Sequence, residues 1–127
     1  MKNKTQSGLE FLIVSAVVLF FFVIFFVAIQ TNTEERNKEK ELMLVNNLAL
    51  SVQDEINLAT EASSGYKREF YVPDRISNKD YYISIVENSI YIKTDDNALS
   101  LQVEPVIGNI KKGDNIIKKE DGKIYLN

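Results

Sequence analysis

An unbroken apolar run from Phe11 to Ile29 constrains this chain more than any other feature. It contains 19 residues, and Ser15 is its only polar member. As an α-helix it would be roughly 29 Å long, close to the ~30 Å hydrocarbon core of a bilayer. Six of the seven Phe residues lie inside it, whereas all six Tyr residues lie at or beyond Tyr66. The sequence therefore predicts two parts that are suited to different solvents.

The apolar run is expected to stay in the mature protein. A cleavable secretory signal has a shorter apolar core of about 7–15 residues and a small-residue cut site after it, and none follows Ile29. Lys2 and Lys4 precede the run, and positive charge beside a first membrane helix is held on the cytoplasmic side. We expect the amino end inside the cell and everything after Ile29 outside.

Composition excludes several classes of function. The chain has no Cys and no His, so thiol nucleophiles, Ser-His chemistry and the usual zinc ligands are absent, and neither an enzyme, a metal nor a cofactor is expected. The formal net charge of −3 comes with no basic stripe, which argues against nucleic acid as a partner. Weak candidates remain for calcium at Asp95-Asp96-Asn97 and Asp114-Asn115, and for an adhesive patch at Tyr66, Tyr71, Tyr81, Tyr82 and Tyr91.

Residues 8–64 contain no proline and no interior glycine, which predicts one long helix ending at Ser63-Ser64-Gly65. Its outer half is amphipathic, with a single apolar stripe at Leu42, Val45, Ala49, Val52, Ile56 and Ala59. Thr31-x-x-Glu34 and Asn32-x-x-Glu35 also match capping boxes, so a hinge at residues 31–33 is the alternative to a continuous helix.

Beyond Gly65 the apolar period changes to two, which predicts strands. An Asn88-Ser89 turn would pair Glu87 with Ile90, Ile85 with Ile92 and Ile83 with Thr94, placing the isoleucines on one face. Asp121-Gly122 predicts a second hairpin that pairs Lys119 with Ile124 and Ile117 with Leu126. Two more strands are expected at Phe70-Tyr71-Val72 and around Leu99, Leu101 and Val103.

These five or six strands predict a small antiparallel sheet that needs a cover, and the amphipathic stripe is the available one. We therefore expect an α+β fold: a long N-terminal α-helix, with an apolar membrane or filament half and an amphipathic outer half, packed against a small antiparallel β head. The expected divisions are a leader at 1–5, an apolar helix at 6–30, a polar then amphipathic extension at 31–64, and the head at 65–127.

The start of the chain, Lys4-Thr5-Gln6-Ser7-Gly8-Leu9-Glu10-Phe11 followed by the apolar run, resembles the class III signal peptide of archaeal type IV pilin-like proteins. Gly8 stands where these pilins usually have serine, and Thr5 stands where a glycine or another small residue is common. The archaellins share this organisation but usually lack the glutamate. The resemblance implies recognition through Lys4, Thr5, Gln6, Gly8 and Phe11, and cleavage between Thr5 and Gln6 by a membrane prepilin peptidase.

The resemblance further implies a structural role for the cleaved chain. It would be a major or minor pilin that leaves the membrane lipid, joins copies of itself and other pilins at a membrane assembly platform, and forms a surface filament, with adhesion as the expected role. Glu10 would act in assembly by pairing with the new amino terminus of a neighbour, unless Gln6 cyclises to uncharged pyroglutamate. The alternative is an uncleaved, signal-anchored membrane protein whose extracellular head binds a partner.

Overall fold

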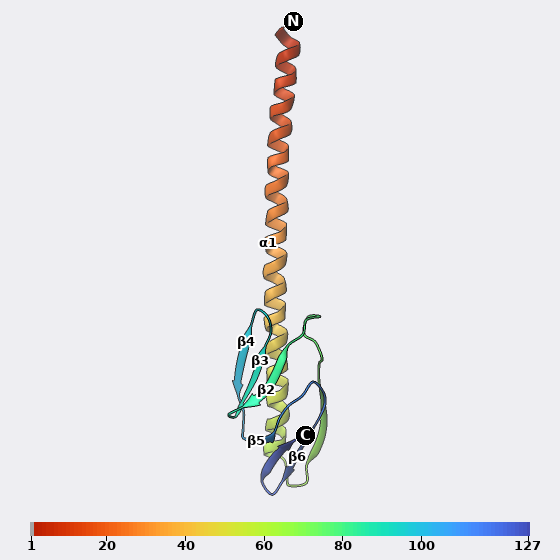
Figure 1. The fold of residues 1–127 in the computed structure, drawn as a ribbon, viewed down its shortest axis with the longest axis vertical. Helices are drawn as coiled ribbons and strands as arrows, with labels where there is room; N and C mark the ends of the chain where they lie inside the picture. The colour runs from red at the N-terminus through yellow and green to blue at the C-terminus, as the bar shows by residue number, and fades with distance from the viewer. Residues whose placement is uncertain (1) are drawn as a thin grey trace. The chain divides into compact units, whose positions relative to one another are not determined.

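A computed structural model describes residues 2–127, with side chains from Asn3 onward; Met1 of the expected leader lies outside the described residues. One long helix packs against a small, mainly antiparallel β structure, which confirms the α+β prediction (Figure 1). The elements are α1 (Lys2–Glu61), β1 (Lys67–Val72), β2 (Tyr82–Val86), β3 (Ser89–Lys93), β4 (Ala98–Gln102), β5 (Val106–Gly108), β6 (Gly113–Glu120) and β7 (Lys123–Leu126). The chain divides into two compact units, one up to Asn37 and one from Lys38 to Asn127.

In the first unit, the apolar run is helical and exposed. Its most apolar 18-residue window has a mean hydropathy of 3.3, none of it is buried, and the helix is long and apolar enough to cross a membrane. Residues 31–33 are helical as well. Their side chains donate back to carbonyls one turn earlier, Thr31 Oγ1 to Val27 at 2.7 Å and Thr33 Oγ1 to Ile29 at 2.9 Å, so they do not cap a new helix.

In the second unit, α1 buries the predicted apolar stripe with one correction. Leu42 is 48% exposed, and Glu41, only 2% exposed, lies at that level of the buried face. Because Glu41 is four residues before Val45, it continues the stripe geometrically, although its carboxylate needs a charged partner to be buried. Leu48 extends the stripe at 9% exposure. The other predicted members are buried in the core: Val45, Ala49, Val52, Ile56 and Ala59.

The helix ends at Glu61, close to the expected signal. Gly65 has a φ of 95°, a left-handed conformation that glycine adopts without a Cβ penalty. Its N–H donates to the Lys119 carbonyl at 2.8 Å, and the Lys119 N–H donates to the Tyr66 carbonyl at 2.9 Å. The chain therefore leaves the helix directly into pairing with the end of β6.

The strands form two sheets, where the sequence predicted one. β2, β3 and β4 make a three-stranded antiparallel sheet, and the order of the second sheet is β1-β6-β7-β5. β5 runs parallel to β7, a pairing that no local turn signal can announce. Gly108 ends β5 with a φ of 109°, and a Cβ there would lie 2.0 Å from the Leu126 carbonyl oxygen, so this approach requires glycine.

The two predicted hairpins differ in accuracy. The Asp121-Gly122 turn and both of its pairs, Lys119 with Ile124 and Ile117 with Leu126, are confirmed. The other turn lies one residue earlier, at Glu87-Asn88, where both residues have positive φ. The observed pairs are therefore Ile85 with Ile90 and Ile83 with Ile92, so the predicted register is wrong. The isoleucines still share one face because the partner shifts by two residues.

A network of three asparagines closes the end of the head. Asn115, with no exposed surface, accepts from the Lys111 N–H at 3.0 Å and donates to the Lys111 and Gly113 carbonyls. Asn127 donates to Asn115 Oδ1 at 2.8 Å and to the Asn109 carbonyl at 2.9 Å. Asn109 Oδ1 in turn accepts from the Ile85 N–H at 2.8 Å, which links this network to the three-stranded sheet.

Candidate processing and assembly segment

All six residues of the predicted processing and assembly sites lie on the first turns of α1 and are exposed. They are Lys4, Thr5, Gln6, Gly8, Glu10 and Phe11. Phe11 has 72% of its surface exposed, and a Cβ built on Gly8 meets no atom within 4 Å. Within this unit, the segment is therefore accessible from all sides.

The Thr5–Gln6 bond lies within the first two turns of the helix. Helix ends fray, and the first four N–H groups of a helix have no carbonyl partner within it. Unwinding this turn to present an extended bond to a peptidase therefore breaks few backbone hydrogen bonds. A cleavage site deeper in the apolar run would lack this advantage.

Glu10 lies at the boundary between the polar start and the apolar run. Its helical neighbours one turn away are Gln6 on one side and Ile13 and Val14 on the other. Within residues 3–127, no ion pair or hydrogen bond forms at its carboxylate. A carboxylate in this position is costly in an apolar medium unless it finds a cation or a donor.

The large side chains of the apolar run are exposed in their own unit. Phe20 and Phe21 meet edge to face with ring centroids 6.5 Å apart. A shallow hollow runs beside them along the helix, lined by Val18, Phe21, Phe22, Ile24, Phe25 and Ala28. This relief of bulky rings and smaller residues offers a surface on which another helix could interlock.

A buried carboxylate, Glu41, is paired with a half-exposed lysine, Lys79, and the sequence analysis missed this pair. Lys79 Nζ donates to Glu41 Oε2 at 3.0 Å and to Asp96 Oδ2 at 3.4 Å. Hydrogen bonding from Thr94 and then Lys79 lowers the pKa of Glu41 below its usual value of 4.5. Glu41 belongs to α1 and Lys79 to the loop between β1 and β2, so no short motif joins them. This pair fastens the loop to the helix.

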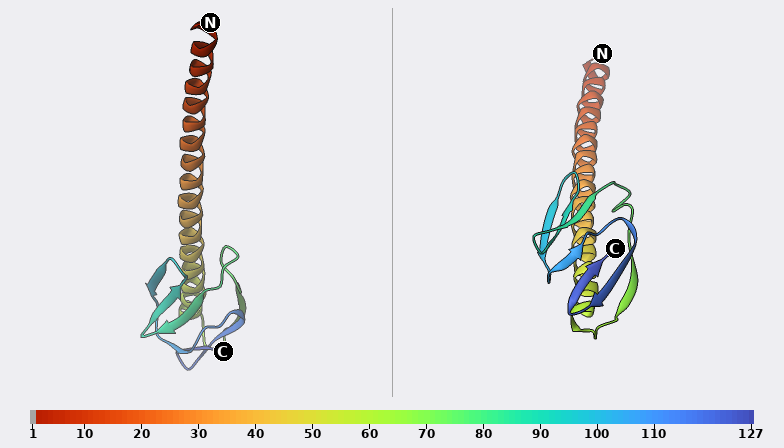
Figure 2. Two further views of the ribbon diagram at one scale, coloured as in Figure 1. Left: turned by 45° about the horizontal axis from the view of Figure 1, so that its top comes forward. Right: turned by 60° about the horizontal axis from the view of Figure 1, so that its bottom comes forward.

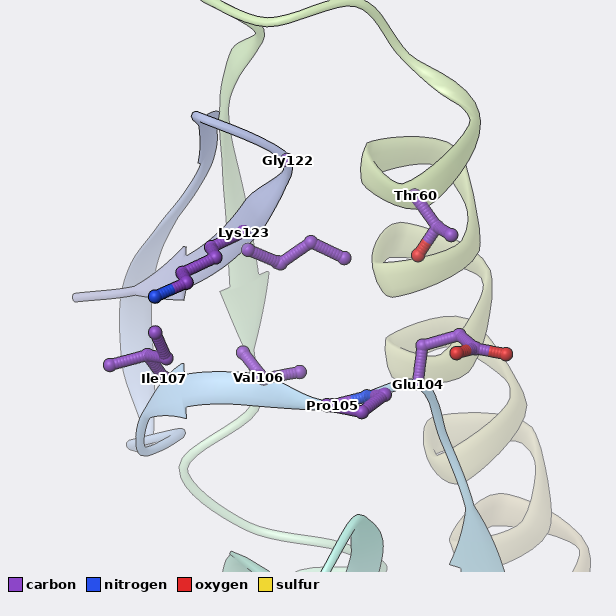
Figure 3. Close-up of a pocket in the computed structure, with 8 residues that line it drawn as sticks. Thr60, Glu104, Pro105, Val106, Ile107, Gly122 and Lys123 are labelled. Carbon is purple, nitrogen blue, oxygen red and sulfur yellow. The ribbon is translucent and has the colours of Figure 1, made fainter.

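The head also has an open pocket of about 330 Å³ between the end of α1 and strands β5 and β7 (Figure 3). Thr60, Glu104 and Lys123 are its polar members, and Val106, Ile107 and Ile124 are among its apolar ones. The ammonium of Lys123 and the carboxylate of Glu104 point in opposite directions in Figure 3. The pocket therefore presents no facing acid and base.

The weak candidates from the sequence are not assembled into sites. Asp96 is paired with Lys79, and the Asn115 amide is used by backbone groups. Among the described residues, no group of three His, Cys, Asp or Glu is placed to hold a metal. The five tyrosines are divided: Tyr81 is buried, and only Tyr82 and Tyr91 pair, with ring centroids 6.3 Å apart.

The contacts of Tyr81 stabilise the loop between β1 and β2. Its hydroxyl donates to the Pro73 carbonyl, and Lys112 Nζ lies 4.6 Å from the centre of its ring while donating to Asp80. Burial, aided by nearby Asp74, raises the pKa of Tyr81 to about 12. It therefore anchors the loop that also carries Lys79.

No known protein-family model matches the chain, and neither a curated protein nor a solved structure matches it.

Proposed function

We propose that this chain is a structural subunit, major or minor, of an archaeal type IV pilus-like surface filament. The observation that carries the proposal is the exposed apolar helix from Phe11 to Ile29, which begins directly after Glu10, a carboxylate with no ion pair within residues 3–127. The separate, well-packed unit from Lys38 supports it, because a filament subunit needs a soluble part that folds independently of its assembly helix.

Processing precedes assembly in this proposal. A prepilin peptidase removes residues 1–5, and with them Lys2 and Lys4, whose ammonium groups could not enter an apolar filament core. Membrane lipid surrounds the helix before assembly, with the amino end cytoplasmic and the head outside. At the assembly platform the helix exchanges lipid for neighbouring helices.

Close packing and polar pairing drive that exchange, because lipid is already as apolar as the side chains it contacts. The phenylalanine-rich relief of the run supplies the packing. Glu10 supplies the polar part when it meets the amino group that cleavage creates at Gln6 of a neighbour. If Gln6 cyclises to pyroglutamate, its amino terminus carries no charge, and Glu10 can only hydrogen-bond to it.

Sequencing the amino terminus of the protein from sheared surface filaments tests the proposal. A chain that begins at Gln6 and is enriched in the filament fraction is the expected result. A chain confined to the membrane and still beginning at Met1 or Lys2 would refute it in favour of a signal-anchored protein with a binding head.

The role of Glu10 has its own test. Glu10→Ala is expected to leave cleavage and membrane insertion intact and to reduce incorporation into filaments, measured as the ratio of filament to membrane protein. Glu34→Ala is the matched control, since Glu34 lies on the same helix outside the apolar run. Incorporation of Glu10→Ala at the level of this control would remove Glu10 from the mechanism.

A further inference from the structure

The head presents four sheet edges: β2 and β4 in one sheet, β1 and β5 in the other. Unpaired edges attract other strands, and proteins usually obstruct them. Two are obstructed here. At β2, the Ile85 N–H already donates to Asn109 Oδ1 at 2.8 Å. β5 has only three residues and follows Pro105, which has no N–H to offer.

The edge of β4 is open and uncharged. No charged residue occurs from Asn97 to Val103. The Thr94 N–H donates to the Asn97 carbonyl and the Val103 N–H to the Asn88 carbonyl, both at 2.8 Å. These bonds fix which residues of β4 direct their backbone groups toward β3 and which direct them away. The backbone groups of Ala98, Ser100 and Gln102 consequently point away from β3, toward the free edge.

One helix side chain marks the end of this edge. Gln53 Nε2 donates to the Gln102 carbonyl at 2.9 Å, as expected for a carbonyl that points away from β3. That oxygen keeps a second lone pair. The side chains of Ala98, Ser100 and Gln102 are exposed, whereas Leu99 and Leu101 pack against the core.

The edge of β1 is open too, but it is charged. The bond from the Lys119 N–H to Tyr66 sets the alternation of the β1–β6 ladder, which leaves the backbone groups of Lys67, Glu69 and Tyr71 pointing outward. Their side chains are exposed, and the alternate residues Phe70 and Val72 pack against the core. Both open edges thus have three outward backbone positions, but Arg68 of β1 is exposed between two of them, whereas Leu99 and Leu101 of β4 both lie inward.

We propose that the β4 edge of one copy pairs antiparallel with the β1 edge of a second copy, with Ser100 opposite Glu69. Ala98 then faces Tyr71, and Gln102 faces Lys67. The pairing rests on the proposed function, because a filament holds the heads side by side with one polarity. It places Leu99 opposite Phe70, and Leu101 opposite Arg68, on the same side of the extended sheet.

The arrangement of the head suits such a contact. β4 and the yellow-green β1 lie on opposite flanks of the head and run in opposite directions in both figures (Figures 1 and 2). Two heads of the same polarity placed side by side would therefore present antiparallel edges. A contact between two different surfaces can repeat from copy to copy, and it builds an open filament where the rotation between copies does not close a ring.

Strand direction, not charge, selects this pairing, because the same register that brings Glu104 near Lys67 also places Asp95 opposite Asp74 of the other copy. In the proposed register Glu104 lies diagonal to Lys67 of the other copy, an attractive neighbour. A two-fold β4–β4 pairing centred on Ser100 would place Asp96, which is already ion-paired with Lys79, opposite Glu104. Pairing of two β1 edges would bring together the charged Lys67-Arg68-Glu69 segments of two copies.

Disulfide cross-linking tests the proposal, since the chain has no cysteine of its own. Outward residues that face each other across an antiparallel pair have Cα atoms about 5.5 Å apart, within disulfide reach. Sheared filaments of Ser100→Cys/Glu69→Cys are expected to give a ladder of dimers, trimers and higher species on non-reducing gels. Each single variant is expected to stay monomeric.

The control is Ser100→Cys/Glu87→Cys, in which the second cysteine lies in the exposed β2–β3 turn. An equal ladder in this control, or dimers of Ser100→Cys alone, would overturn the proposed register. Filaments that contain the chain but give no ladder would overturn the edge pairing and leave the proposed function standing. Absence of the chain from filaments would overturn both.

Discussion

Replacing Asn115 with alanine tests whether the asparagine network holds the head together. The substitution removes four hydrogen bonds, to the Lys111 N–H, the Lys111 and Gly113 carbonyls, and the Asn127 amide. At a net value of about 1 kcal/mol each, their sum is about 4 kcal/mol. Lys111 is exposed, so water can replace part of its bonding, and we expect a loss of about 2–3 kcal/mol.

Urea unfolding of the full chain in detergent micelles measures this loss. All six tyrosines lie in the head, so tyrosine fluorescence reports on that unit alone. With an m-value of roughly 1–2 kcal/mol/M, a loss of about 2–3 kcal/mol lowers the midpoint by about 1–3 M. Asn47→Ala is the control, because Asn47 is exposed on α1 and alanine favours the helix. Equal midpoints for the two variants would refute the reasoning.

Three further predictions concern other parts of the unit from Lys38 to Asn127. Ile56→Ala, at a fully buried position, is expected to cost about 2–5 kcal/mol in the same urea assay, against less than about 1 kcal/mol for the half-exposed Leu58→Ala. Because the pKa of Glu41 is lowered, its contribution to the stability of the folded state is present above pH 4.5 and is lost as the pH falls below that value. Glu41→Gln should lower Tm at neutral pH and lack this acid-dependent loss of stability. Because the pKa of Tyr81 is raised to about 12, its contribution to the stability of the folded state is present below pH 10 and is lost toward pH 12. Tm should therefore fall over this pH range, and Tyr81→Phe should make that fall smaller.

The sequence predicted best where a signal is local and has one reading. Asp121-Gly122 specifies its hairpin because glycine readily takes the second positive φ of the turn, and both predicted pairs are present. Asn88 lacks such a neighbour. It takes the second position of its turn, where the prediction had it first, and the register moved accordingly.

Contacts between distant segments account for the remaining differences. Leu42 looked like the start of the buried stripe, but Glu41 occupies that level because Lys79, 38 residues later, neutralises its carboxylate. The parallel β5–β7 pair likewise depends on a crossover through β6. Neither has a signature in a short window of sequence. The residues expected for processing and assembly are placed on α1, and their roles remain predictions.

Glu10 and Glu41 show how one residue type serves two different purposes in this chain. Glu41 is buried against Lys79 of the same chain, so its charge contributes to the folding of the head. Glu10 has no ion pair within residues 3–127 and borders an apolar surface that is exposed on all sides. A carboxylate whose partner lies in the same chain stabilises the fold, whereas one whose partner must come from another chain can stabilise only an assembly. In the proposed filament, the free energy that Glu10 contributes depends on a second copy, as does the free energy of the apolar helix beside it.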